Sequence, residues 1–218
     1  MPKIVSLEEA VSVVADGMTI MVGGFMGCGN PHNVLDALVT TGVRNLTLIC
    51  NDAAFPNWGV GKLVTNKMLR KLIASHVGLN PDVAAQMNSG ELVVELVPQG
   101  SLIEKIRAGG AGLGGVLTPT GLGTIVAEGK QVVTVDGKDF LLEPPLRADV
   151  AFINGFDIDM NGNVWYKGTT RNFNVYMATA ADVVVAEADH LVQLGAIKPE
   201  DVVTPGVLVD YIVDGGRL

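Results

Sequence analysis

A glycine-rich loop follows the first strand that the sequence predicts. Residues 19–22 (TIMV) are apolar and indicate a short strand, and residues 23–29 (GGFMGCG) follow with four glycines in seven positions. Glycine lets a ligand lie against bare backbone. Asn30 and Pro31 are suited to the N-cap and first position of a helix, whose first N–H groups would point at that ligand. The pattern predicts a small-ligand site, with a tight turn that binds nothing as the alternative.

Gln99 is a candidate for stabilising negative charge. It follows the strand expected over residues 92–97, and a side-chain amide in such a place can donate a hydrogen bond to a developing oxyanion. A surface glutamine that caps the next helix is the alternative. Asn51 and Asp52 are polar residues at the end of another expected strand, and Asp52 is interpreted as a loop cap rather than a ribose ligand.

Other reactive side chains are interpreted as structural. Cys28 has no basic neighbour to lower its pKa, so a small apolar loop filler is the favoured interpretation. Arg171 is expected to be a paired charge, and Glu187 is assigned to the structure. The histidines are scattered without ligand spacing, at His32, His76 and His190.

A formal G-x-G-x-x-G pattern runs from Gly110 to Gly115. A dinucleotide fingerprint must follow a strand and open a helix, whereas this one follows an expected helix. The pattern therefore gives little support for a dinucleotide site, and no G-x-S-x-G hydrolase elbow is present.

Alternating strands and helices must position these residues. Apolar runs predict strands over residues 19–22, 46–50, 72–75 and 92–97, and capping residues predict helix starts at Ser6, Asn30, Asn80 and Ser101. This alternation indicates a parallel sheet with right-handed crossovers. Ligands bind such sheets beyond the carboxyl ends of the strands. Residues 23–29, Asn51, Asp52 and Gln99 are therefore expected at one edge.

The second half of the chain has a different pattern. Residues 131–135 and 140–142 predict a β-hairpin on the Asp136-Gly137 turn, and further strands are expected over residues 150–153, 182–186 and 207–213. The predicted fold class is α/β, an open and mostly parallel sheet flanked by helices, with an antiparallel hairpin excursion. Residues 1–218 are expected to form a single domain.

Composition excludes several classes of partner. The 218 residues carry a formal net charge of −8, which disfavours nucleic acid and anionic membrane surfaces. Two cysteines without metal-type spacing fit a reduced, cytoplasmic protein. The N-terminus lacks a signal-peptide pattern, and no apolar run approaches the ~18 residues of a membrane span. No membrane contact and no metal site are expected.

Four sequence blocks resemble the α (A) subunit of class I coenzyme A transferases, most of all the acetate/butyrate–acetoacetate (3-oxoacid) branch. The resemblance extends over nearly the whole chain, and the blocks occur in the family's order. They are DGMTIMVGGFMGCGNP, VPQGSLIEKIRAGGAGLGGVLTPTGLGT, ADVAFINGFDIDMNGNVWYKGTTRNFN and VVTPGVLVDYIV.

The resemblance implies one half of an enzyme. In the family, a glutamate in a Ser-Glu-Asn-Gly motif of the β (B) subunit attacks the acyl-CoA, and the reaction is covalent and ping-pong. None of the nine glutamates of this chain precedes Asn-Gly. The resemblance implies oxyanion stabilisation by Gln99, an α2β2 assembly, and CoA as a substrate with no permanent cofactor. The implied CoA-binding loop is Gly23, Gly24, Phe25, Met26, Gly27, Cys28 and Gly29.

One departure from the family pattern leaves the acid substrates open. Residues 154–157 (NGFD) replace a stretch that contains a basic residue in similar sequences. A sugar-phosphate isomerase active without a partner, and a non-catalytic metabolite sensor, are the alternative functions on a similar sheet.

Overall fold

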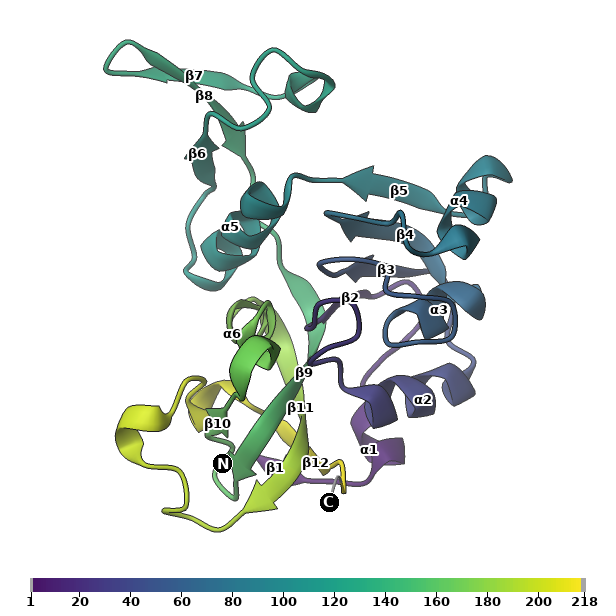
Figure 1. The fold of residues 1–218 in the computed structure, drawn as a ribbon, viewed down its shortest axis with the longest axis vertical. Helices are drawn as coiled ribbons and strands as arrows, with labels where there is room; N and C mark the ends of the chain where they lie inside the picture. Colours follow the sequence, from purple (N-terminus) through teal and green to yellow (C-terminus); the bar gives the residue numbers. More distant parts are fainter. Residues whose placement is uncertain (1, 217–218) are drawn as a thin grey trace.

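In the computed structural model, which describes residues 2–216, a nine-stranded sheet runs through the molecule (Figure 1). Its main path is β1-β12-β11-β9-β2-β3-β4-β5, with parallel neighbours throughout, and β10 pairs antiparallel with β9. The strands are β1 (Lys3–Ile4), β2 (Thr19–Val22), β3 (Leu46–Ile49), β4 (Leu69–Ala74), β5 (Val93–Leu96), β9 (Ala148–Asp159), β10 (Val164–Trp165), β11 (Ala181–Val192) and β12 (Tyr211–Asp214).

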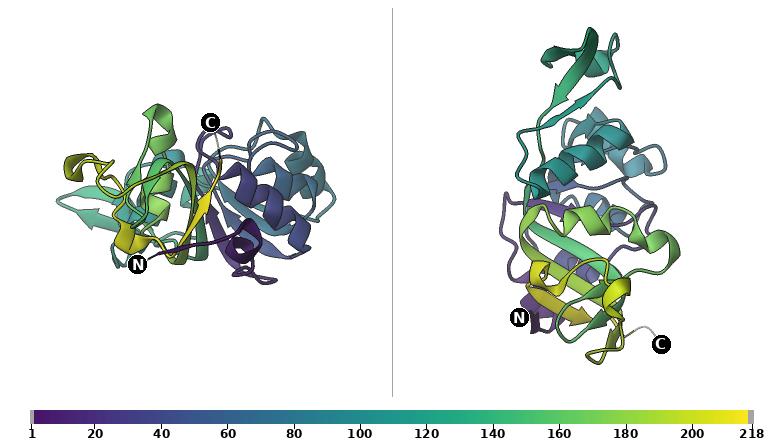
Figure 2. Two further views of the ribbon diagram at one scale, coloured as in Figure 1. Left: turned by 90° about the horizontal axis from the view of Figure 1, so that it is seen from below. Right: turned by 90° about the vertical axis from the view of Figure 1, so that its left-hand side faces the viewer.

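Helices cover both faces of this sheet (Figures 1 and 2). One face packs against α1 (Leu7–Val11), α2 (His32–Thr41), α3 (Gly61–Thr65) and α4 (Pro81–Asn88). The other face packs against α5 (Gln99–Gly110) and α6 (Asn174–Met177). Short 3₁₀ helices lie in the connections, at η1 (Ile125–Ala127), η2 (Gly168–Arg171), η3 (Pro199–Asp201) and η4 (Gly206–Leu208).

Strand side chains alternate between two apolar cores. Ile20 and Val22 belong to the core under α1–α4, whereas Met21 between them belongs to the core under α5 and α6. This alternation follows from the two-residue period of a strand. Because both faces are covered, the strands read as unbroken apolar runs, as expected of a buried parallel sheet. The predicted α/β class is confirmed.

A second sheet projects from the main body, at the top of Figure 1 and of the right-hand view in Figure 2. It is antiparallel, in the order β6-β8-β7, with β6 (Val116–Thr118), β7 (Val132–Val135) and β8 (Lys138–Glu143). We call residues 116–143 the arm. Asp136 and Gly137 at its tip have φ of +50° and +73°, the left-handed values that a tight hairpin turn requires. The predicted hairpin is confirmed.

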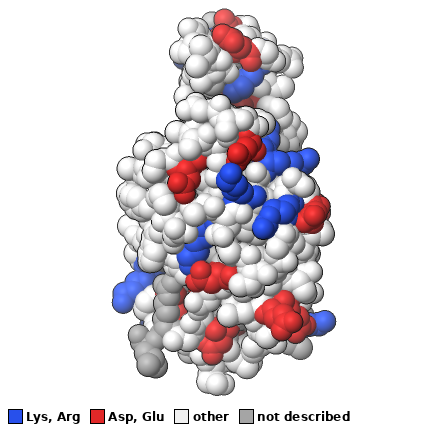
Figure 3. Space-filling model, turned by 90° about the vertical axis from the view of Figure 1, so that its right-hand side faces the viewer, with Lys and Arg blue, Asp and Glu red and all other residues white. Residues whose placement is uncertain are grey.

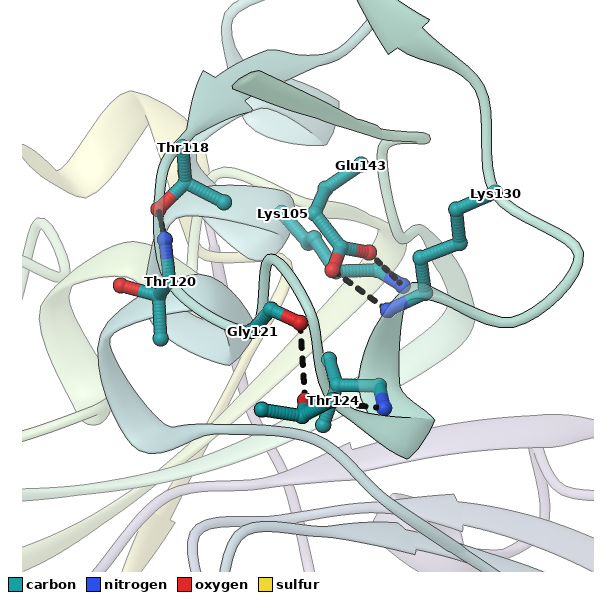
Figure 4. A network of polar contacts seen from close by, with 8 residues as sticks. Lys105, Thr118, Thr120, Gly121, Thr124, Lys130 and Glu143 are labelled. Carbon is teal, nitrogen blue, oxygen red and sulfur yellow. Dashed lines mark hydrogen bonds and ion pairs between the residues drawn. The ribbon is translucent and has the colours of Figure 1, made fainter. Parts of the chain in front are cut away.

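A buried ion cluster ties the arm to α5 (Figure 4). The carboxylate of Glu143 is fully buried and accepts hydrogen bonds from Lys105 Nζ at 3.2 Å and from Lys130 Nζ at 2.5 Å. Lys105 itself is 6% exposed. Two cations therefore compensate one carboxylate inside the protein, where an unpaired charge would be costly.

Several predicted boundaries are wrong. Asn30 does not cap α2, which begins at His32 with Pro31 as its N-cap and no side-chain cap hydrogen bond there. Similarly, α5 begins at Gln99 after Pro98, so Ser101 lies inside the helix instead of capping it. In both cases a proline fixes the backbone just before the helix and takes the capping position. Asn80 does cap α4, accepting from Asp82 N.

The last predicted strand is also shorter than expected. Residues 207 and 208 of the expected strand belong to η4, and the strand that joins the sheet is Tyr211–Asp214. In contrast, the strands at 150–153 and 182–186 extend to twelve residues each, as β9 and β11. Their mutual pairing from Ala148 to Asp159 carries them past the ends of the other strands.

The surface on the right of Figure 1 carries both signs of charge. Lysine, arginine, aspartate and glutamate side chains are interspersed there (Figure 3). The ion pairs at the protein surface include Lys67 with Glu91 and Lys71 with Glu95. Among the described residues, no helix is long and apolar enough to cross a membrane.

Candidate active site

The residues expected at one edge of the sheet do lie together. Gln99 Nε2 donates a hydrogen bond to Asn51 Oδ1 at 2.7 Å. Asn51 Nδ2 donates to Asp52 Oδ2 at 2.8 Å, and the same oxygen accepts from the backbone N–H of Met26 at 2.9 Å. A continuous chain of hydrogen bonds thus connects α5, the end of β3 and the glycine-rich loop of residues 23–29.

Asn51 fixes the orientation of the Gln99 amide. Asn51 is 1% exposed, and its Oδ1 also accepts from Ser75 Oγ at 3.2 Å. Since Asn51 presents its oxygen, Gln99 must turn its nitrogen toward it. A side-chain amide nitrogen carries two hydrogens. The second N–H of Gln99 is therefore available to an oxygen outside the protein.

The backbone N–H groups of the glycine-rich loop are largely used within the protein. Gly24 N donates to Asn172 Oδ1 at 3.0 Å, and Met26 N donates to Asp52. Phe25 and Cys28 exchange backbone hydrogen bonds of 3.0 and 2.8 Å. The loop therefore has few free N–H donors. It is not arranged to surround a phosphate with backbone N–H groups.

The first N–H groups of α2 are occupied as well. Glu187, fully buried at 0% exposure, accepts from Asn33 N at 3.3 Å and from Val34 N at 2.8 Å. The expectation that this helix start points at a ligand is wrong, because a carboxylate from β11 takes the position. The assignment of Glu187 to the structure has a physical reason: it neutralises the positive end of the helix dipole.

Three asparagine side chains hold the loop from both sides. Asn30 Nδ2 donates to Gly23 O, while its Oδ1 accepts from Val60 N at 3.1 Å. From the opposite side, Asn172 Nδ2 donates to Cys28 O at 3.1 Å and Asn174 Nδ2 donates to Gly29 O at 3.0 Å. The loop is thus positioned by the residues around it.

Two glycines are required by close approaches. Gly24 has φ +123°, and a Cβ there would lie 1.9 Å from Asn30 Nδ2. Gly27 has φ +87°, and a Cβ there would lie 2.1 Å from Trp58 Nε1. Neither the backbone angle nor the space suits a larger residue.

A small hollow of about 330 Å³ opens beside this loop. Gln99 borders it, and its apolar walls include Phe25, Ile103 and Phe173. The remaining lining residues are Gly100 and Asn172. The hollow therefore combines an oriented amide donor with apolar surface.

The two cysteines differ in their surroundings. Cys28, expected to be a small apolar loop filler, is exposed, with its Sγ 3.3 Å from Thr169 Oγ1. Cys50 is buried, and burial, together with the nearby charge of Asp52, raises the pKa of its thiol well above the usual value. Only Cys28 is accessible to reagents.

The remaining candidates have structural contacts. His32 Nε2 lies 3.0 Å from Gly27 O, and His190 Nδ1 lies 3.0 Å from Asp157 Oδ1. His76 contributes its backbone carbonyl to Ala53 N. Arg171 forms no ion pair within residues 2–216, so its expected role as a paired charge is wrong.

Sequence reasoning missed some contributors to this site. Asn172 and Asn174 are far along the chain from the loop they hold: Asn172 lies 148 residues after Gly24, and Asn174 lies 145 residues after Gly29. The only signal was the cluster of polar residues in TTRNFN. Ile103 was missed because one isoleucine on an amphipathic helix resembles any core residue.

The comparison with protein families is decisive. The family model described as coenzyme A transferase matches residues 4–215. The chain belongs to the coenzyme A transferase family. Its relatives include the acetate CoA-transferase subunit alpha of Escherichia coli K12, 54% identical over 97% of this chain and 96% of the relative. The acetoacetyl-CoA:acetate/butyrate CoA transferase alpha subunit of Clostridium acetobutylicum is 53% identical over 97% of both.

Solved structures share the fold of this transferase chain. An acyl-CoA transferase from Escherichia coli O157:H7, in a thioester complex with CoA, matches with a TM-score of 0.88 at 23% identity. The match covers 100% of this chain and 51% of that one. Glutaconate coenzyme A-transferase from Acidaminococcus fermentans matches with a TM-score of 0.86 at 20% identity, over 97% of this chain and 75% of that one. The isomerase and sensor alternatives find no support in these comparisons.

Proposed function

We propose that this chain is the α subunit of an enzyme that moves CoA between acetoacetyl-CoA and a short acid such as acetate or butyrate. The names of the two relatives at 54% and 53% identity support these substrates. Both relatives are alpha subunits matched over nearly their whole length. The nucleophilic glutamate is supplied by a β subunit, in accordance with the absence of a Glu-Asn-Gly sequence here.

The observation that carries this proposal is the hydrogen bond from Gln99 to Asn51 at the edge of the hollow. This bond uses one N–H of the Gln99 amide, and we propose that the second donates to the substrate. When a carboxylate attacks an acyl carbonyl, negative charge develops on the carbonyl oxygen. A donor whose orientation is already fixed stabilises that charge without reorganisation in the transition state.

The reaction proceeds by exchange of acyl groups on the partner's glutamate. Its carboxylate attacks the thioester carbonyl, the C–S bond breaks, and an acyl-glutamyl anhydride and CoA thiolate form. The thiolate then attacks the glutamyl carbonyl and releases the first acid as a carboxylate, leaving a glutamyl-CoA thioester. The acceptor acid repeats the two steps in reverse, so no external acid, base or oxidant is consumed.

The glycine-rich loop, residues 23–29, is the proposed CoA-binding element. Its backbone donors are mostly occupied, so CoA contacts its exposed side chains and not an amide cradle. Phe25 and Met26 are 44% and 38% exposed, and Trp58 on the neighbouring loop is 50% exposed. These apolar surfaces suit the pantetheine arm of CoA. CoA is a substrate here, and we propose no permanent cofactor.

The proposed assembly is an α2β2 heterotetramer in the cytoplasm, with residues 1–218 acting as one domain. The arm supports association with another chain because it exposes apolar side chains, with Ile125 at 82% and Val132 at 50%. Exposed apolar surface of this kind is typical of interfaces between proteins. Both subunits must meet near Gln99 for the nucleophile to reach the hollow.

The experiment is CoA transfer from acetoacetyl-CoA to acetate or butyrate, measured with the chain alone and with a co-expressed β subunit. Activity of the complex and inactivity of the chain alone support the proposal. Activity of the chain alone places the nucleophile in this chain and overturns it. Inactivity of a stable complex toward both acids overturns the proposed substrates.

A further inference from the structure

The hollow beside Gln99 has no charged side chain among its lining residues. Its walls are the aromatic rings of Phe25 and Phe173, the aliphatic side chain of Ile103, and the uncharged groups of Gln99, Gly100 and Asn172. A volume of about 330 Å³ is at the lower end of the range for small-molecule sites. Such a space suits a short apolar group that lies next to the amide donor.

Ile103 is one of the apolar residues that line this space. It lies four residues after Gln99 on α5, so both side chains project from the same face of the helix. Ile103 is half-buried and packs against the core beneath α5. Its position is therefore fixed by packing, whereas Phe25 extends from a loop.

We propose that this hollow receives the acyl chain of the substrate and that Ile103 limits the length of that chain. The inference rests on the proposed function, because it identifies the hollow with the acyl part of that reaction. With the reacting carbonyl at Gln99, the carbons beyond it extend along α5 toward Ile103. Short unbranched monocarboxylic acids are the substrate class that fits.

The charge of the hollow argues against dicarboxylic acids. A second carboxylate at the far end of the acyl chain would meet Ile103 and Phe173, and no residue of this chain that lines the hollow carries a compensating positive charge. Burying an unpaired carboxylate costs far more than burying a methyl group. Succinate is therefore expected to be a poorer acceptor than butyrate.

The test uses the assembled enzyme and compares acceptor acids within each variant. Specificity constants (kcat/KM) are measured for acetate, butyrate, hexanoate and succinate with the wild type, Ile103→Ala, Ile103→Val and the control Val207→Ala. Val207 is 91% exposed and lies outside the hollow. Ile103→Ala is expected to raise the hexanoate-to-acetate ratio roughly tenfold, the discrimination that one or two methylenes provide in an apolar pocket. Ile103→Val is expected to give an intermediate ratio and Val207→Ala an unchanged one.

The outcomes separate this inference from the function on which it rests. If the wild-type complex transfers CoA but both Ile103 variants keep its ratios within twofold, the hollow does not hold the acyl chain. A wild-type enzyme that prefers succinate to butyrate also overturns the inference. If the wild-type complex transfers no CoA to any acid, the proposed function fails first, and this inference with it. Because ratios are compared within one preparation, partial loss of folded variant does not affect them.

Discussion

Gln99 Nε2 and Asn51 Oδ1 lie 2.7 Å apart. This contact joins the first residue of α5 to the loop that follows the end of β3 at Ile49. Asn51 is buried, whereas Gln99 is exposed at the hollow. One residue therefore orients the amide and the other presents it. The next residue, Asp52, extends the same network to the glycine-rich loop.

Gln99→Ala is expected to lower kcat of the assembled enzyme by roughly 10- to 1000-fold, because the proposed donor to the oxyanion is lost. The matched control is Gln193→Ala, a truncation of an exposed glutamine outside the arm. Steady-state kinetics and size-exclusion chromatography measure turnover and assembly together. Unchanged kcat in a correctly assembled Gln99 variant would remove this residue from the mechanism.

Glu187→Gln is expected to reduce the free energy of unfolding by about 1–2 kcal/mol, because the helix loses a charged cap. A neutral amide has a single acceptor oxygen and cannot serve Asn33 N and Val34 N as the carboxylate does. Chemical denaturation measures the change, with the exposed Glu200→Gln as control. Loss of turnover at undiminished stability would instead point to a chemical role for Glu187.

Glu143→Gln is expected to destabilise the protein by about 3–5 kcal/mol, since it leaves the buried ammonium of Lys105 without a counter-ion. Lys130 loses its partner in the same substitution. The control is Glu128→Gln, at an exposed position on the arm. Equal denaturation midpoints for the two variants would show that the cluster contributes little.

Cys28 is expected to react with a thiol reagent in the folded protein, while Cys50 stays protected. Burial raises the pKa of Cys50, so the folded state keeps its proton where an unfolded thiol would ionise. Its contribution to stability is full below the usual thiol pKa of about 8.5 and falls as the pH rises above it. Mass spectrometry after alkylation measures labelling, with Cys28→Ser and the denatured protein as controls. Rapid labelling of native Cys50 would contradict this expectation.

The parts of the fold set by local pattern could be predicted from the sequence. Apolar runs located β2, β3 and β5 within one or two residues, and the Asp136-Gly137 pair located the hairpin. The shared edge of parallel strands brought Asn51, Asp52 and Gln99 together as expected. These features depend on residues that are close in sequence or on a general rule of sheet topology.

The parts set by distant residues could not be predicted in this way. Asparagine is a common N-cap residue, but the side-chain amide of Asn30 bonds the backbone of Gly23 and Val60 instead. The side chain that accepts from the first N–H groups of α2 is Glu187. Local propensity gives no information about a carboxylate 153 positions away along the chain. Similarly, nothing near Gly24 indicates that Asn172 accepts its N–H.

The same distances have a consequence for the order of events during synthesis. The ribosome delivers the glycine-rich loop and the start of α2 before their partners Asn172, Asn174 and Glu187, which follow at separations of 148, 145 and 153 residues. The first strand, β1, pairs with β12, so its partner is synthesised later still. A nascent chain can assemble β2 to β5 early, yet the glycine-rich loop lacks its contacts with Asn172 and Asn174 until these residues have been synthesised. The proposed CoA-binding loop is therefore held in place only after residues 172–174 have left the ribosome.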